Sequence, residues 1–532
     1  MILELVGSRL LAPYFGNSLF VWTALIGIML GFMSLGNFIG GRLADWYAQQ
    51  CAAASAKNTD IRTRKKDKKK SADTADTKGS TRTRSTSDAV DTDDSSGTRL
   101  LFWILITTAL SIATVTFIDA LVLAPLAQTS SLRTGLVIGA TILFAIPCTL
   151  LGMISPVSIR TVMQRIESSG STVGSFYALS TLGSIVGTFL AGFWLISTVG
   201  SHRLVGLLAV IPFMLALIYR PRKNIRAWTL LVLTALAIAG SLATAVYASS
   251  GFDTGYDWYY IGESVGYGEG DDANRPYRFL SRDYHSMESA VYIDNGDPVV
   301  FRYYHYYDLA LAYAAQGQNN WPGRTLLIGG GTFSYPRHQL AQFSFSTIDV
   351  VEIDPALEQI ARRDFFLADD PRMTIHLEDG RMFLNRSSKT FDVIILDAFK
   401  SAQSIPYQLT TRESMQRCYD QLSDDGILAF NIIAHATGPG SRYVAAQYRT
   451  LKEVFPHVQM YYVHGGLGAD LERAQNISII CTKEKEGDFG ARLQALDPVL
   501  TGSPIDPAVL HNDVRSLTDD FAPVDQLLMD LH

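Results

Sequence analysis

Three consecutive glycines followed by an acidic residue form the pattern in this chain that best fits a ligand-binding site. An apolar run leads into Gly329, Gly330 and Gly331, and a second apolar run ends at Glu352. Glycines let the backbone approach a ligand closely, and a carboxylate about 20 residues further on can accept both hydroxyls of a ribose. The pattern therefore predicts an adenosine-binding crossover. A purely structural tight turn is the alternative interpretation of the glycines alone.

An α/β domain must position these residues. Apolar strands are expected between helical stretches at 325–328, 347–352, 373–376, 392–397, 426–433 and 477–481. Continuous apolar strands separated by helices indicate a mostly parallel sheet that is covered on both faces. Ligands bind such sheets at the carboxyl ends of the strands, where Asp379 and Asp397 also fall.

A small β region is expected in front of this sheet. Residues 289–293 and 298–304 flank the turn Asp294-Asn295-Gly296-Asp297, and an Asn-Gly pair suits a tight hairpin turn. We therefore expect a β region at 255–310 and a Rossmann domain at 311–532.

The first 250 residues predict a different environment. Before residue 255 there are 22 Lys and Arg against 13 Asp and Glu, whereas from 255 onward there are 23 against 38. Apolar runs, most of them near the ~20 residues that cross a bilayer, lie at 19–41, 100–123, 136–154, 176–198, 204–219 and 227–247. Small residues recur inside them, as in 30–36 and 183–187, which suits close helix packing in lipid. We expect a multi-pass helical membrane domain at 1–250, in contact with a lipid bilayer. Buried soluble helices are the alternative.

A charged, low-complexity insert at 49–98 interrupts this domain. Such a composition cannot bury enough apolar surface to fold. The basic block 62–70 suits a nucleic-acid or lipid-headgroup contact, but a solvated cytoplasmic loop is the better interpretation, and we expect no nucleic-acid partner.

The cysteines do not indicate a metal site. Cys51, Cys148, Cys418 and Cys481 lack metal-ligand spacing, and only the last two could pair. We expect free buried thiols and no metal.

Six motifs in order along the chain resemble the membrane-fused branch of the spermidine synthase-like (polyamine aminopropyltransferase-like) family. They are GGGTFSYPR (329–337), VVEIDP (350–355), LEDGRMFL (377–384), FDVIILDAF (391–399), IPYQLTTRES (405–414) and LTDDFAPVD (517–525). Residues 3–27 and 34–45 are similar to the first spans of that branch. The resemblance covers nearly the whole chain apart from the insert.

The resemblance implies a class I methyltransferase-like Rossmann domain that binds decarboxylated S-adenosylmethionine and passes its aminopropyl group to an amine such as putrescine. By motif position, Glu352 would hold the ribose hydroxyls and Asp379 the adenine amino group. Asp397 would be the catalytic carboxylate, which takes a proton from the attacking amine or holds the cationic substrate. A helix cap or turn acid is the structural alternative for each.

The acceptor pocket would border an aromatic run at 303–307. Tyr304, His305, Lys400 and Tyr407 are the expected substrate-binding residues, and stacked rings can cradle a cationic amine. A packed hairpin and helix start is an equally good interpretation of the aromatic run.

Two departures from the family pattern weaken polyamine chemistry in particular. Thr332 and Lys400 stand where the soluble aminopropyltransferases have acids. Lys400 and Arg337 would instead suit a carboxylate, such as that of intact S-adenosylmethionine.

Three functions therefore stay open. The first is an aminopropyltransferase, the second another S-adenosylmethionine-dependent transferase such as a methyltransferase. The third is a membrane transporter or sensor with a non-catalytic adenosyl-binding domain, which the scarcity of ionisable groups in the spans disfavours. A homodimer is a family expectation.

The side of the membrane is set by two conflicting signals. Basic loops alternate correctly for the cytoplasmic side, and if all six runs cross, the acidic domain faces away from the cytosol. The run 204–219 has only 16 residues, however, and if it does not span, the domain returns to the cytoplasm, where S-adenosyl cofactors are made. We expect the cytoplasmic placement.

Overall fold

The structure is a computed structural model. It describes residues 1–15, 18–72, 94–129, 132–162, 169–221, 224–247, 251–266, 274–282, 287–294, 296–318, 320–398, 405–435, 437–463, 475–502 and 504–528. The chain separates into two compact units, one of residues 1–11 and 22–249, the other of residues 12–21 and 250–532.

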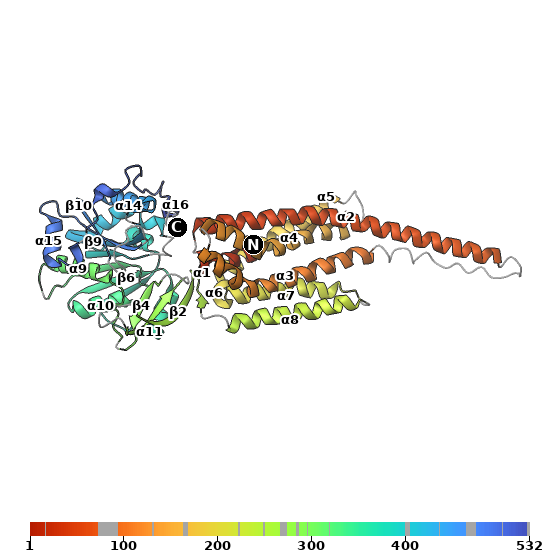
Figure 1. Cartoon of the computed structure of the whole chain (residues 1–532), viewed down its shortest axis with the longest axis horizontal. Helices are drawn as coiled ribbons and strands as arrows, with labels where there is room; N and C mark the ends of the chain where they lie inside the picture. The colour runs from red at the N-terminus through yellow and green to blue at the C-terminus, as the bar shows by residue number, and fades with distance from the viewer. Residues whose placement is uncertain are drawn as a thin grey trace. The chain divides into compact units, whose positions relative to one another are not determined.

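Helices build the first unit (Figure 1). They are α1 (Ile2–Phe15), α2 (Leu19–Ala72), α3 (Asp94–Thr129), α4 (Leu132–Val162), α5 (Ser169–Leu190), α6 (Ile196–Val199), α7 (Ser201–Ile218) and α8 (Ile225–Tyr247). Six helical stretches are long and apolar enough to cross a membrane: Leu19–Gln50, Gly97–Ala127, Arg133–Val162, Val173–Leu195, Ser201–Ile218 and Ile225–Ala243. The fourth continues from α5 into a π-helical turn at Ala191–Leu195. Each of these stretches contains most of one of the six predicted apolar runs.

Glycines allow α2 and α4 to touch backbone to backbone. A Cβ on Gly36 would lie 2.0 Å from the carbonyl oxygen of Thr149, and one on Gly152 would lie 2.3 Å from that of Met33. The predicted close packing is therefore present at Gly36, whereas a Cβ on Gly183 would meet no atom within 4 Å.

The insert differs from its prediction. Helix α2 continues to Ala72, so the expectation that 49–72 does not fold is wrong. This stretch is rich in Ala, Lys, Arg and Gln, whose high helix propensity favours continuation of α2 beyond its apolar part. The middle of the insert, 73–93, lies outside the described residues, and α3 begins at Asp94.

Helix α7 is longer than the apolar run that predicted it. Its 18 residues, Ser201–Ile218, extend over ~27 Å at 1.5 Å per residue. That length approaches the ~30 Å of a bilayer's hydrocarbon core.

The second unit begins with a four-stranded antiparallel sheet of β1 (Gly251–Asp253), β2 (Trp258–Val265), β3 (Pro276–Ser281) and β4 (Ser289–Tyr292), paired in that order. The predicted second hairpin arm, 298–304, is wrong, because β4 pairs with the preceding β3 instead. Pro298 has no N–H to donate to a ladder. Val300, Phe301 and Tyr303 turn into the buried core.

A seven-stranded sheet follows, in the order β10-β11-β9-β8-β5-β6-β7. Its strands are β5 (Arg324–Ile328), β6 (Thr347–Glu352), β7 (Met373–Leu377), β8 (Phe391–Leu396), β9 (Leu422–Ala434), β10 (His457–Tyr462) and β11 (Gln475–Thr482). Only β11 runs antiparallel to its neighbours. This is the predicted class I methyltransferase-like Rossmann topology, with β10 as the strand that the prediction lacked.

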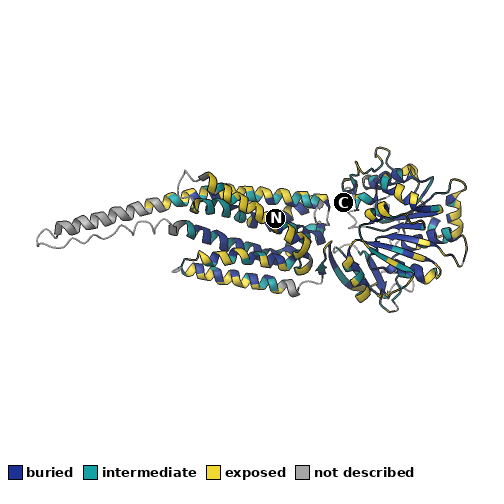
Figure 2. Ribbon diagram, turned by 180° about the vertical axis from the view of Figure 1, so that it is seen from behind, coloured by how far each residue is buried: buried dark blue, intermediate teal, exposed yellow. Residues whose placement is uncertain are grey.

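Helices cover both faces of this sheet and leave its central strands mostly buried, whereas the edge strand β7 is partly exposed (Figure 2). They are α9 (Tyr304–Ala315), α10 (Ser334–Gln342), α11 (Pro355–Asp364), α12 (Gly380–Arg386), α13 (Arg412–Gln421), α14 (Arg442–Lys452), α15 (Phe489–Leu496) and α16 (Val524–Leu528). One core cluster joins the sheet to α12, α13 and α14, and another joins it to α9, α10 and α15. The strand order reverses between β5 and β8, and ligands of such sheets bind at this switch point.

Candidate functional site

The glycine turn brings the ends of β5 and β8 together. Gly329 has φ +100°, and a Cβ there would lie 2.2 Å from the carbonyl oxygen of Asp397. The backbone N–H of Asp397 donates to the Ile328 carbonyl at 2.9 Å. Only glycine fits this conformation and this contact, so Gly329 and Asp397 are neighbours at the switch point.

Glu352 lies against the same turn. Its Oε2 accepts hydrogen bonds from the backbone N–H groups of Gly330 and Gly331, at 2.9 and 3.0 Å, and its Oε1 accepts one from Asp354 at 2.9 Å. Burial raises the pKa of the Glu352 carboxyl, although these hydrogen bonds and nearby Arg282 oppose that shift. A carboxylate offers about four acceptor positions, so one is left for a ligand hydroxyl. The structure thus gives Glu352 a second role, holding the glycine turn, beside its predicted ribose contact.

Asp397 lies at the end of β8 among hydrogen-bond donors. The side chains of Tyr303, Tyr307 and Asn431 lie beside it, and the Asn431 amide donates to Asn476 Oδ1 at 3.0 Å. Burial raises the pKa of Asp397 to about 6, and these three polar neighbours limit the rise. Such a carboxyl can exchange a proton near neutral pH. Burial also holds the pKa of Tyr303 and Tyr307 well above the usual value, so both stay protonated donors.

Three residues of the predicted aromatic run, Tyr303, Tyr304 and Tyr307, form one buried cluster, whereas His305 is exposed. Tyr303 and Tyr304 have ring centroids 4.7 Å apart, and Tyr335 from α10 lies 5.2 Å from Tyr304 and 5.0 Å from Tyr307. Tyr304 is only 3% exposed, so its ring is core packing, as the structural interpretation expected. Its predicted contact with the acceptor would need its hydroxyl, which hydrogen-bonds Tyr303.

Asp308 is a candidate residue that the sequence analysis missed. Its carboxylate accepts from Tyr335 Oη at 3.2 Å and pairs with His338 Nε2 at 2.9 Å. His305 Nδ1 lies 3.7 Å from the same carboxylate. Burial would raise the pKa of Asp308, but the two histidines hold it below its usual value. The spacing of His305 and Asp308, three residues apart on one helix, was the available signal.

Asp379 caps a helix. Its Oδ1 accepts from the backbone N–H of Met382 at 2.9 Å at the start of α12. A Cβ on the next residue, Gly380, would lie 2.4 Å from Ile328 Cγ2, so this helix end packs against the end of β5. The structural alternative is therefore present, and the adenine contact stays a prediction for a residue beside the switch point.

Thr332, one of the two departures, and Arg337, one of the two cations expected to meet a carboxylate, are both engaged in contacts within the protein. Thr332 is buried, with its Oγ1 2.9 Å from Ser334 Oγ and its N–H donating to Ser289 Oγ. Arg337 donates to the carbonyl oxygens of Phe365 and Gly296 at 2.9 and 3.0 Å, which leaves its expected ligand contact without support.

The two remaining substrate candidates are Lys400 and Tyr407. Lys400 lies outside the described residues. Tyr407 is 55% exposed, and its carbonyl accepts from Thr410 in a short 3₁₀ turn. Its substrate role stays a prediction.

The last family motif acts as a clamp. Asp519 pairs with Arg381 at 2.7 Å, accepts from Thr411 Oγ1 at 2.6 Å and donates its backbone N–H to Glu413. These contacts tie the segment after β11 to α12 and α13, which carry the neighbouring motifs.

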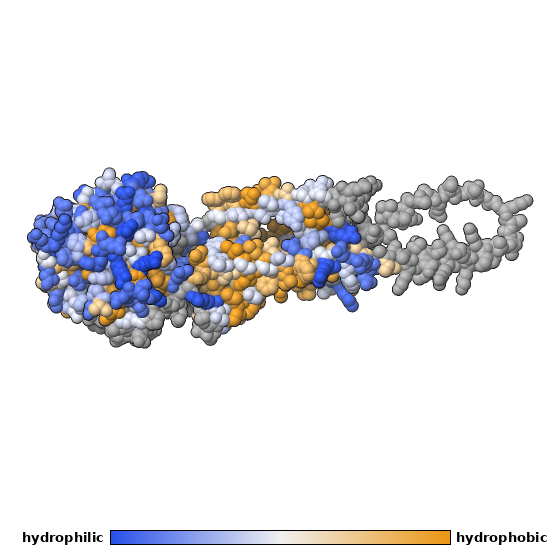
Figure 3. Space-filling view, turned by 90° about the horizontal axis from the view of Figure 1, so that it is seen from above, coloured by the Kyte–Doolittle hydropathy of each residue, from blue (hydrophilic) through white to orange (hydrophobic). Residues whose placement is uncertain are grey.

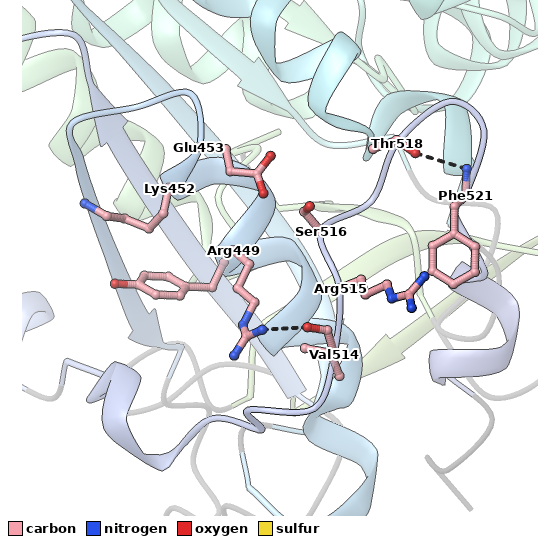
Figure 4. A pocket seen from close by; sticks show the side chains of 9 residues that line it. Arg449, Lys452, Glu453, Val514, Arg515, Ser516, Thr518 and Phe521 are labelled. Carbon is pink, nitrogen blue, oxygen red and sulfur yellow. Dashed lines mark hydrogen bonds between the residues drawn. The ribbon is translucent and has the colours of Figure 1, made fainter.

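A hollow of about 670 Å³ lies beside the clamp, between α14 and residues 514–521. In Figure 4 Arg449 reaches across it to the Val514 carbonyl, and the Phe521 N–H donates to Thr518. None of the predicted site residues lines it.

The cysteine prediction is confirmed where the structure describes it. Cys148, Cys418 and Cys481 are free and buried. Burial raises the pKa of the Cys418 thiol to about 12, so this thiol stays protonated. Within the described ranges no group of three or more His, Cys, Asp or Glu residues could hold a metal ion.

The comparison with known families settles what this domain is. Residues 305–465 match the spermine/spermidine synthase domain. The C-terminal part of the chain is a spermidine synthase-like domain. It is 28% identical over 218 residues to a polyamine aminopropyltransferase of Vibrio vulnificus, covering 39% of this chain and 71% of that protein.

Two further relatives are similar to this spermidine synthase-like domain. One is covered over a smaller share of its length, and the other has a lower sequence identity. Polyamine aminopropyltransferase 2 of Pseudomonas aeruginosa is 31% identical over 146 residues, which are 26% of this chain and 42% of that protein. A probable spermidine synthase of Corynebacterium glutamicum has a solved structure that is 19% identical, covers 50% of this chain and 94% of its own, and has a TM-score of 0.39.

Proposed function

We propose that this protein is a membrane-bound aminopropyltransferase. It binds decarboxylated S-adenosylmethionine and transfers the aminopropyl group to an amine such as putrescine. The observation that carries the proposal is the carboxyl of Asp397, with a pKa of about 6, next to the glycine turn that Glu352 holds. The names of the Vibrio and Pseudomonas relatives support the substrate class.

The proposed reaction requires the protein to position the two substrates and to supply one proton acceptor. The amine nitrogen forms a bond to the aminopropyl carbon, the carbon–sulfur bond breaks, and its electron pair returns to sulfur. The sulfonium thereby becomes the neutral thioether methylthioadenosine. The attacking amine must lose a proton, and the Asp397 carboxylate, which lies beside Tyr303 and Tyr307, takes it or holds the cationic amine.

The membrane location is part of the same proposal. The six apolar helices of the first unit support insertion in a bilayer by their length and composition. We place the transferase domain on the cytoplasmic side because its cofactor is made there. Two chains would pair through their Rossmann domains, as the family resemblance suggests.

A second candidate is another S-adenosylmethionine-dependent transferase, such as a methyltransferase. The observation that favours it is Thr332, which is buried against Ser289 and Ser334 and offers no charge to a cationic aminopropyl group. An ammonium group buried without its counter-charge is costly, by several kcal/mol in effective terms.

Calorimetry on the purified full-length protein separates the two. S-adenosylmethionine, its decarboxylated form and methylthioadenosine are titrated separately, and putrescine is then added to detect spermidine. Tighter binding of the decarboxylated form, together with spermidine formation that Asp397→Asn lowers at least ~100-fold, supports the proposal. Tighter binding of intact S-adenosylmethionine without spermidine formation contradicts it and favours the second candidate.

A further inference from the structure

A second hollow, of about 790 Å³, lies at one end of the helical unit. Tyr47 from α2, Arg99 and Trp103 from α3, and Asn224 and Arg226 at the start of α8 line it. Three segments far apart in sequence therefore build one site. None of these residues belongs to the transferase domain.

The hollow lies at the level where the apolar stretches end. The stretch in α2 ends at Gln50, the stretch in α3 begins at Gly97, and the one in α8 begins at Ile225. Each lining residue is within two helical turns of such an end. Figure 3 shows hydrophobic side chains over the middle of the helices and polar ones gathered at an end. Tyr and Trp are enriched at this depth in membrane proteins, where the lipid headgroups lie.

Apolar packing forms the floor of the hollow. Tyr47 and Trp103 are partly buried against a cluster that includes Ala44, Leu100 and Ala227. Beside it, Ile225 is 81% exposed and Trp228 is 46% exposed. Water is a poor partner for these surfaces, whereas the upper part of an acyl chain covers them well.

The rim of the hollow is positive. Arg99 and Arg226 are exposed, and within the part of the chain that the structure describes neither guanidinium has an ion-pair partner. The acid nearest in sequence to Tyr47, Asp45, is already paired with Arg160 at 3.3 Å. Asn224 Oδ1 caps the Arg226 N–H at 3.0 Å, so the positive end of the α8 dipole also lies at this rim.

We propose that this hollow binds the headgroup of an anionic phospholipid. Arg99 and Arg226 hold the phosphate, and Tyr47 and Trp103 pack on the glycerol and the first carbons of the acyl chains. Basic pockets between membrane helices recognise anionic headgroups by this combination of charge and depth. The inference rests on the proposed membrane location and is independent of the transferase chemistry.

The test uses full-length protein purified in a neutral detergent. Native mass spectrometry counts retained lipid after addition of phosphatidylglycerol or phosphatidylcholine, for the unaltered protein, for Arg99→Gln with Arg226→Gln, and for Arg42→Gln. Arg42 is the matched control, because it stacks on Phe38 at 4.3 Å and does not line the hollow. We expect phosphatidylglycerol to be preferred about tenfold, and the double variant, but not Arg42→Gln, to lose that preference.

Three results would overturn the proposal. They are equal retention of the two lipids, an equal loss in Arg42→Gln, and displacement of the lipid by millimolar inorganic phosphate, which would make the hollow a site for a soluble anion. Circular dichroism of the double variant confirms its helical fold before the comparison. Spermidine formation, measured in the same preparation, shows separately whether the proposed transferase function stands.

Discussion

At the scale of single residues, Asp397 shows a conflict between reactivity and stability. Its folded pKa of about 6 lies above the ordinary 3.8 because the carboxyl is buried. The folded state therefore favours the protonated form, and this contribution to stability is complete below pH 3.8 and is lost as the pH rises through 6. At neutral pH the fold holds an ionised carboxylate in a poorly solvated place, where it can accept a proton.

Asp397→Asn tests both sides of that conflict. We expect transfer activity to fall at least ~100-fold, since general-base catalysis contributes about 10² to 10⁴. The free energy of unfolding at pH 7.5 should rise by about 1 to 3 kcal/mol, because the penalty for ionising the carboxyl disappears. Thermal unfolding of the full-length protein measures the second effect. Lower stability of the variant at pH 7.5 would show that contacts of the ionised carboxylate stabilise the fold by more than its desolvation costs.

The pH dependence of the reaction gives an independent check on the same residue. For the unaltered protein we expect kcat/KM to increase as the pH rises through about 6, because the carboxylate form accepts the proton. The residual activity of Asp397→Asn should lack this step. A step that persists in the variant would assign the titration to another group.

Glu352 has both a predicted ligand contact and a structural role in the glycine turn. Glu352→Gln should therefore change both ligand affinity and stability. We expect adenosyl-ligand affinity to fall by ~1.5 to 3 kcal/mol, the range for hydrogen bonds to a charged group. The amide would also turn an N–H toward the N–H groups of Gly330 or Asp354, so thermal stability should fall as well. Calorimetry with methylthioadenosine measures the first effect. Glu358→Gln, which removes only the exposed pair with Arg362, is the control. Unchanged affinity would remove Glu352 from the site.

At the scale of elements, the meeting of β5 with β8 is the contact on which the site depends. Gly329→Ala combines a positive φ with a Cβ 2.2 Å from the Asp397 carbonyl, so we expect a loss above 3 kcal/mol or failure to fold. Gly317→Ala has a comparable φ, +77°, but no atom within 4 Å of the Cβ, and should cost only ~1 kcal/mol. Equal losses, measured by thermal unfolding, would mean that backbone strain alone explains Gly329.

The elements show where prediction from sequence succeeds. Strands β5, β6 and β8 are continuous apolar runs that end in Gly, Glu or Asp, so both their type and their functional ends could be read from the pattern. The sequence analysis did not predict strand β10, and it wrongly predicted the second hairpin arm. Strand pairing depends on tertiary contacts as well as on local composition. Asp308 had a local signal in His305, three residues before it, but its two hydrogen-bond partners, His338 and Tyr335, come from another helix.

At the scale of the whole molecule, two signals conflict over the side of the membrane on which the spermidine synthase-like domain lies. Basic residues that include Arg42, Arg99, Arg220 and Arg226 lie near the ends of apolar stretches at one end of the helical unit. The rule that cytoplasmic loops are basic would place that end inside. With six crossings, the chain would then leave α8 on the outer side. Supply of the cofactor argues for the opposite, and the 18-residue length of α7 makes it the helix on which the answer depends.

A reporter fused after His532 decides this. We expect cytosolic activity, because S-adenosyl compounds are made there and a transferase without its cofactor has no function. Lengthening α7 by three leucines after Leu208 should then export the reporter, since a helix extended by ~4.5 Å spans the hydrocarbon core without strain. The same insertion after Leu236 in α8, which leaves α7 unchanged, should not. An exported reporter in the unaltered protein would show that all six helices cross. The basic loops would then be the better guide, and the domain would need its adenosyl ligand from outside the cell.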